Sequence, residues 1–190
     1  MRYKHVFAVC AYKDSPYLEQ CIRSLKAQTV PSHIIICTST PSSYIDRLAW
    51  KYGLQVFVRQ GESGIKDDWN FAYSMAEGEL VTIAHQDDMY HRDYSARLLA
   101  AHRRYPDMTV FTTDYVIVKQ GTLITGDAML WIKRILRTPL RFPQMNDRAW
   151  VKKLAFVLGN PICCPATTYH KAVLGEPFVP VSYTHLTLPT

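Results

Sequence analysis

The alternation of short apolar runs with helical patterns most constrains how this chain can fold. Apolar runs of strand length occupy residues 6–11, 33–37, 54–58 and 80–84. Between the first two, Leu18, Cys21, Ile22 and Leu25 repeat at intervals of three and four, as on one face of a helix. A strand–helix–strand series predicts a largely parallel sheet with right-handed crossovers. We therefore expect an α/β fold.

Local signals set the expected limits of the helices. Ser15 and Pro16 favour a helix start at that point, and Ser42 or Ser43 can cap a helix that Gly53 ends. Two further helices are expected at about 65–76 and 94–105. Beyond them the patterns predict strands at 109–113, 115–118 and 166–169, with helices at 127–137 and 146–158.

Size and cysteine content narrow the class of protein. The 190 residues suffice for one domain with a substantial core, and no apolar run approaches the ~20 residues of a membrane span. The five cysteines have no metal-type spacing, and the start of the chain has no signal-peptide pattern. These features indicate a cytoplasmic protein in a reducing compartment.

The positive charge is concentrated in one segment. The formal net charge is +6, and residues 133–153 contain seven basic residues against the single acid Asp147. Such a segment can face phosphates, an anionic membrane surface or nucleic acid, or it can be a solvated helix face. The basic residues are Lys133, Arg134, Arg137, Arg141, Arg148, Lys152 and Lys153.

Two adjacent carboxylates, Asp87 and Asp88, follow the fourth apolar run. In open α/β sheets ligands bind beyond the carboxyl ends of the strands, and hard divalent ions take oxygen ligands there together with substrate phosphates. The pair therefore indicates a metal-assisted diphosphate site, with a solvated turn that caps the next helix as the alternative. No G-x-G-x-x-G or G-x-x-x-x-G-K pattern is present, which argues against dinucleotide-dependent dehydrogenases and P-loop enzymes.

An ordered set of short motifs resembles the inverting family 2 glycosyltransferases, which have the GT-A fold. The resemblance covers residues 5–120 well and 121–180 more loosely. It implies a mostly parallel, Rossmann-like sheet flanked by helices, with a helical acceptor-side segment towards the C-terminus. The matching pieces are 6–12, 15–18, 25–29, 63–65, Trp69 with Asn70, and 85–88.

The resemblance implies a reaction and a set of ligands. A sugar would pass from a nucleotide-diphosphate donor to a glycan or lipid-linked acceptor by single displacement, assisted by Mg²⁺ or Mn²⁺, as in polysaccharide biosynthesis. The matched positions assign metal binding to Asp87 and Asp88. His85 departs from the family pattern, which usually has an acid there. The implied nucleotide-sugar contacts are Ala11, Tyr12, Thr38, Ser39, Asn70, Gln86 and Asp87.

The expected catalytic machinery is incomplete. The family places its general base well after the metal motif, and we expect that base beyond residue 180, so that this chain lacks transferase activity. Residues 181–190 resemble a translated library adaptor and are expected to be non-native. Residues 1–180 then form one incomplete domain, with 1–120 as the nucleotide-sugar half and 121–180 as the start of the acceptor half.

Two other functions stay open. A nucleotidyltransferase could use the same acids, and a non-catalytic nucleotide- or glycan-binding domain would tolerate His85 in place of an acid. Nucleic acid is not an expected partner, since no recognition motif accompanies the basic residues. The segment 127–158 either contacts the inner face of a membrane as a basic amphipathic surface or covers the sheet.

Overall fold

The computed structural model describes residues 2–119, 122–124, 128–142, 144–146, 148–156 and 162–175. These residues form two compact units. The first runs to Phe111 and resumes at Thr168, and the second is Thr112–Thr167. The predicted non-native segment 181–190 lies outside the described residues.

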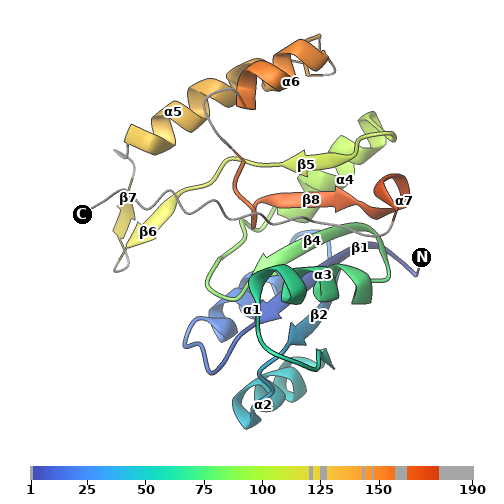
Figure 1. Ribbon diagram of the computed structural model, residues 1–190, viewed down its shortest axis with the longest axis vertical. Coiled ribbons are helices and arrows are strands. Elements are labelled where there is room, and N and C mark those ends of the chain that lie inside the picture. The colour runs from blue at the N-terminus through green and yellow to red at the C-terminus, as the bar shows by residue number, and fades with distance from the viewer. Residues whose placement is uncertain are drawn as a thin grey trace. The chain divides into compact units, whose positions relative to one another are not determined.

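The first unit is built on a six-stranded sheet with the order β3-β2-β1-β4-β8-β5 (Figure 1). The four expected strands are present and parallel, with Val6 paired to His33 on one side and to Val81 on the other. The later strand, β8, runs antiparallel to β4. The strands are β1 (Tyr3–Ala11), β2 (His33–Thr38), β3 (Gln55–Val58), β4 (Gly78–His85), β5 (Val110–Thr112) and β8 (Thr167–His170).

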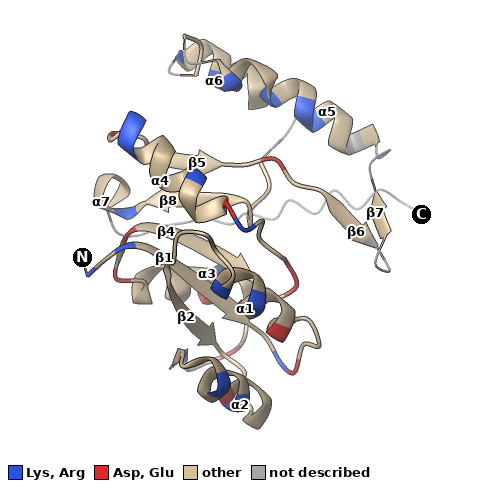
Figure 2. Cartoon of the chain, turned by 180° about the vertical axis from the view of Figure 1, so that it is seen from behind, with Lys and Arg blue, Asp and Glu red and all other residues tan. Residues whose placement is uncertain are grey.

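Helices cover both faces of this sheet. Figures 1 and 2 show α3 on one face and α1 on the other, as right-handed crossovers require when the strand order reverses between β3 and β4. The helices are α1 (Leu18–Lys26), α2 (Ser43–Tyr52), α3 (Ile65–Met75), α4 (Tyr94–Arg104) and the short α7 (Lys171–Leu174).

The helix boundaries agree with the prediction at α2 and differ at α1. Ser42 caps α2 by accepting a hydrogen bond from the Ile45 amide at 3.3 Å, and Gly53 ends it with a φ of +61°. The predicted start of α1 at Ser15 was wrong, since the helix begins at Leu18 without a side-chain cap. The Ser15 hydroxyl accepts from the Tyr17 amide at 3.3 Å, just before the helix.

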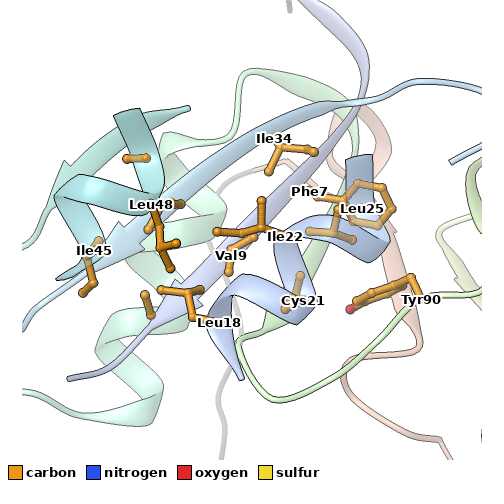
Figure 3. Close-up of a cluster of buried hydrophobic side chains, with 14 of the residues drawn as sticks. Phe7, Val9, Leu18, Cys21, Ile22, Leu25, Ile34, Ile45, Leu48 and Tyr90 are labelled. Atoms are coloured by element: carbon orange, nitrogen blue, oxygen red, sulfur yellow. The ribbon is translucent and has the colours of Figure 1, made fainter. Parts of the chain in front are cut away.

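The core of the first unit lies between the sheet and the helices α1, α2 and α4 (Figure 3). Phe7 and Val9 of β1 are fully buried there, and the apolar face predicted for α1 packs onto them. A buried polar chain crosses the same region. Its members are His5, Thr82, Thr168 and Tyr94, joined by contacts of 2.8, 2.6 and 2.8 Å.

Gly78 fixes where β4 begins. A Cβ atom at this position would lie 2.7 Å from Cγ2 of Val6 and 2.8 Å from the carbonyl oxygen of Leu80. Only glycine lets β4 approach β1 this closely, so Gly78 sets the packing of the central strands.

The second unit contains a small hairpin and two helices. The predicted strand at 115–118 is replaced by antiparallel β6 (Ile117–Lys119) and β7 (Thr122–Ile124). The helices are α5 (Ala128–Arg137), the 3-10 helix η1 (Thr138–Arg141) and α6 (Ala149–Phe156). α6 begins later than the predicted residue 146, and its predicted end at 157–158 lies outside the described residues. Among the described helices, none has the length and apolar content needed to cross a membrane.

Candidate functional site

Asp87 and Asp88 lie where the sequence placed them, directly after β4 at the carboxyl ends of the parallel strands. The amide of Asp88 donates to the carbonyl of His85 at 3.2 Å, which closes a tight turn and brings the three side chains to one side. One carboxylate oxygen from each aspartate and a ring nitrogen of His85 all lie within 4.8 Å of one another.

His85 is the member of this group whose role the sequence left open. Its ring packs against Trp69 of α3 with centroids 4.6 Å apart, and its Nδ1 lies 3.8 Å from Oδ2 of Asp88. Its Nε2 is buried and has no hydrogen-bond partner among the described residues. A ring nitrogen and two carboxylates within 4.8 Å of one another fit a divalent cation, for which all three groups are common ligands.

The electrostatics of the group point the same way. Burial raises the pKa of Asp88 to about 6, and the neighbouring charge of Asp87 adds to this effect. Burial lowers the pKa of His85, against an opposing effect of Asp87. A bound cation would stabilise the ionised form of Asp88 and suits the neutral form of His85, which burial favours.

Gln86 joins the loop after β1 to the loop after β4. Its side-chain amide accepts from the Tyr12 amide at 2.9 Å and donates to the Tyr12 carbonyl at 3.1 Å. This paired contact fixes the backbone beside Asp87. Ala11 is buried below it, whereas the Tyr12 side chain is 46% exposed, with the Lys13 ammonium 5.0 Å from its ring centre. The exposed ring is therefore available to stack on a base.

The end of β2 adds hydroxyl groups to the same edge. The Lys13 amide donates to Oγ1 of Thr40 at 2.6 Å, which links the loop after β1 to the loop after β2. Thr38 is buried, and its Oγ1 accepts from the Thr40 amide at 3.0 Å. Six of the predicted contacts lie at this edge of the sheet. Ala11 and Thr38 are the last residues of β1 and β2. The other four lie in the loops that follow β1, β2 and β4, and they are Tyr12, Ser39, Gln86 and Asp87.

Sequence reasoning missed the ion pair that organises the loop before α3. Asp68 accepts from Nε of Arg59 at 2.8 Å through Oδ1, and its Oδ2 accepts from the Ser39 hydroxyl at 3.0 Å. Ser39 is thereby held by α3 rather than being free in the loop. No spacing rule connects Arg59 to Asp68, since they meet only after the chain has folded back from β3.

Asn70 and the predicted general base are not among the residues at the strand ends. Asn70 is half-buried on α3, next to the Trp69 that packs on His85, and so lies on an element that touches the site. No general base is assigned among the described residues, and the segment beyond 180, where it was predicted, lies outside them.

The sequence profile described as Glycosyl transferase family 2 matches residues 6–159. No curated protein matches by sequence.

Solved structures show the same fold. S. aureus TarS 1-349 in complex with UDP has a TM-score of 0.59 at 19% identity, over 90% of this chain and 48% of that one. Glucosyl-3-phosphoglycerate synthase from Mycobacterium tuberculosis, in complex with Mn²⁺ and UDP-glucose, has a TM-score of 0.59 at 13% identity, over 90% and 57%. The chain therefore spans about half the length of these structures, and the likeness confirms the expected GT-A-type sheet.

Proposed function

The chain belongs to glycosyl transferase family 2, and from this premise we propose that it carries the donor half of a metal-assisted glycosyltransferase site. The observation that carries the proposal is the group formed by His85, Asp87 and Asp88 beside the loop that Gln86 holds. It joins candidate cation ligands to an exposed aromatic ring and hydroxyl groups, which is what a nucleoside diphosphate requires.

Each group has a proposed role in donor binding. Tyr12 stacks on the base, while hydroxyls at the end of β2 accept or donate to its edge. Asp87 and Asp88 hold the divalent ion, with His85 as the third neighbour. When bound, such an ion neutralises charge that develops on the leaving diphosphate. The bond that breaks joins the anomeric carbon to that diphosphate, and the acceptor hydroxyl attacks from the opposite face with inversion.

UDP with Mn²⁺ is the first combination to test. The TarS and synthase structures described above were solved with UDP and with UDP-glucose plus Mn²⁺. In this chain Asp87 and Asp88 offer hard oxygen ligands that suit Mg²⁺ as well as Mn²⁺. A panel of nucleoside diphosphates with each ion therefore defines both the base and the metal.

The second unit supports a proposal about the acceptor. α5 and α6 carry basic residues and no acid (Figure 2), and their apolar side chains Trp131, Ile135 and Trp150 are exposed. A surface of this composition suits anionic membranes or lipid-linked acceptors. We expect wild-type protein to co-sediment with anionic vesicles and Trp131→Ser/Ile135→Ser to lose this. Trp50→Ser, on the exposed side of α2, is the matched control.

A thermal-shift experiment tests the donor site. UDP with Mn²⁺ should raise the melting temperature of the wild type, and Asp87→Ala should abolish the metal-dependent part of the shift. Asp107→Ala removes an exposed acid in the loop between α4 and β5 and should behave as wild type. A shift that Asp87→Ala retains in full, or no shift with any nucleotide, would remove the basis of the proposed donor site.

A nucleotide- or glycan-binding domain without catalysis is the second candidate. The observation in its favour is His85, which stands where the family pattern has an acid. Hydrolysis of UDP-glucose in the absence of acceptor, measured on a chain that also contains the predicted general base, separates the two. A binding domain leaves the donor intact, whereas a catalytic site slowly transfers the sugar to water.

A further inference from the structure

A second cluster of metal-ligand residues lies at the other end of β4. Glu79 is the second residue of β4, His102 lies in the last turn of α4, and His170 ends β8. One ligand atom from each lies within 4.8 Å of the other two. β4 separates this cluster from Asp87, which follows the strand's last residue, and all three members belong to the first unit.

The separations match a tetrahedral metal site. Nε2 of His102 lies 3.2 Å from Oε1 of Glu79, and Nε2 of His170 lies 3.5 Å from the same oxygen. Ligands about 2.1 Å from a tetrahedral zinc ion lie roughly 3.4 Å from each other. The two measured distances bracket that value, so a zinc ion could bind with little movement of the side chains.

The hydrogen bond of the His170 ring leaves a lone pair facing the carboxylate. Nδ1 of His170 lies 2.8 Å from the carbonyl oxygen of Met108, which can only accept, so this nitrogen carries the proton. In the neutral ring Nε2 then carries a lone pair towards Glu79. A backbone carbonyl that fixes the tautomer in this way is the usual outer partner of a metal-bound histidine.

His102 gives the second, independent indication. Its side chain is 9% exposed, and its Nε2 has no hydrogen-bond partner among the described residues even though Glu79 is 3.2 Å away. The ring nitrogen therefore does not point along an N–H···O line to the carboxylate. This direction fits two ligands that converge on a common point better than it fits a histidine–glutamate ion pair.

The Lys4 ammonium fixes the orientation of the Glu79 carboxylate. That ammonium donates to Oε2 of Glu79 at 2.7 Å, which leaves Oε1 for the histidines. The Glu79 side chain is 28% exposed, so the cluster has a route to solvent and room for a water as fourth ligand.

We propose that Glu79, His102 and His170 bind a zinc-class divalent cation, with a water in the fourth position. Two histidines and one glutamate are a common zinc ligand set. The ion would link β4, α4 and β8, which are distant in sequence, and would secure the antiparallel β8 against the parallel sheet. The site is separate from the proposed donor site because it uses neither Asp87 nor Asp88. Its ligands are expected to prefer Zn²⁺ or Co²⁺ to Mn²⁺.

Calorimetric titration with Zn²⁺ and Co²⁺ tests the proposal in the Asp87→Ala/Asp88→Ala background, which removes the other candidate site. We expect one equivalent to bind, with visible absorption from tetrahedral Co²⁺ and a higher melting temperature. Glu79→Gln, His102→Gln and His170→Gln should each weaken metal binding at least tenfold. Replacing a residue that only supports a metal ligand already weakens binding by about tenfold or more. His91→Gln, at an exposed histidine, should bind as the parent does.

Circular dichroism of the metal-free variants separates loss of the site from loss of the fold, and the conservative Glu79→Gln change is the least disruptive of the three. Binding that survives all three substitutions assigns the ion to other groups, such as the free cysteines, and overturns the proposal. The absence of binding to the folded parent also overturns it. Neither outcome affects the donor site, which is tested through Asp87 with Mn²⁺ and a nucleotide.

Discussion

At the residue scale, the buried histidines differ in what their ring nitrogens meet. Both nitrogens of His5 lie 2.8 Å from hydroxyl oxygens, of Ser32 and Thr82, so the neutral ring is fully satisfied. His85 keeps an unpartnered Nε2 in a site with two carboxylates. The first is a structural histidine and the second a candidate ligand, although both stand directly beside an apolar run, 6–11 and 80–84, in the sequence.

His5 makes the protein sensitive to acid. Burial lowers its pKa from 6.5 to about 3, so below pH 6.5 the unfolded chain binds a proton that the folded chain excludes. Stability therefore falls as the pH drops from 6.5 to about 3, by ~1.4 kcal/mol per pH unit for one group. We expect wild type to lose about 3 kcal/mol more than His5→Gln between pH 7 and pH 4, measured by urea unfolding.

The comparison of slopes isolates His5, because the other titrating groups are common to both proteins. His5→Gln should be less stable at pH 7, since a buried hydrogen-bonded ring is replaced. Parallel pH profiles for the two proteins would contradict the assignment.

Asp88 should respond in the opposite direction when no metal is bound. Its pKa of about 6 lies above the ordinary 3.8, so its ionisation destabilises the folded state as the pH rises through that interval. Asp88→Asn should raise the free energy of unfolding at pH 7.5 in EDTA. The side chain is 43% exposed, and after solvent screening we expect a gain on the order of 1 kcal/mol.

The same variant should gain nothing at pH 3.5, where both states of the wild type are protonated. With Mn²⁺ and UDP present its advantage should disappear, because a proposed ligand is lost. Equal stabilisation at both pH values would point to packing rather than charge.

At the element scale, most of the sheet could be predicted and its far edge could not. Apolar runs and crossover helices marked β1 to β4 because each is a local pattern of burial. The antiparallel direction of β8 depends on pairing between Val81 and Tyr169, which no local pattern encodes. The start of α1 was also predicted wrongly. The Ser15 hydroxyl accepts from the Tyr17 amide, and the helix begins only at Leu18.

The candidate site divides in the same way. Asp87 and Asp88 were found because adjacent acids after a strand are visible in sequence. The contacts of Gln86 with Tyr12 and of Asp68 with Arg59 join segments that are separate in sequence, and neither follows a spacing rule. Motifs thus identified the ligand groups, whereas the interactions that hold them required the fold.

The loop after β1 depends on Gln86 for its position. Gln86→Leu keeps the size of the side chain and removes both contacts to Tyr12, so the stacking ring should lose its fixed orientation. Two hydrogen bonds of about 1 kcal/mol each predict a Kd for UDP with Mn²⁺ that rises roughly fivefold to thirtyfold. Gln60→Leu, at an exposed loop position, is the matched control and should bind as wild type in the same titration.

At the scale of the whole molecule, the first unit is assembled from two distant parts of the chain. Residues up to Phe111 supply most of the sheet, and the segment from Thr168 returns to complete it. Thr168 and His170 enter the buried polar chain and the Glu79 cluster. Stability of the first unit therefore depends on residues that follow the second unit in the sequence.

Lys171 provides the sharpest test of this dependence. Its ammonium donates to the carbonyl oxygens of Tyr73, Ser74 and Ala76 at 2.9, 3.1 and 3.3 Å, and so binds the C-terminal end of α3 from a position nearly 100 residues later. Unpaired carbonyls at a helix end attract cations. Lys171→Met keeps the aliphatic stem and removes these bonds, and we expect a loss of about 2 kcal/mol in the free energy of unfolding.

Lys66→Met is the matched control, because Lys66 is exposed in the first turn of the same helix, where a cation is unfavourable. It should be neutral or slightly stabilising in the same denaturation experiment. Hydrogen exchange gives the second readout. In Lys171→Met the amides of α3 and β8 should exchange faster together, since Lys171 directly follows β8 and its contacts tie that end of the strand to α3. Faster exchange in β8 alone would show that α3 is held without the returning segment.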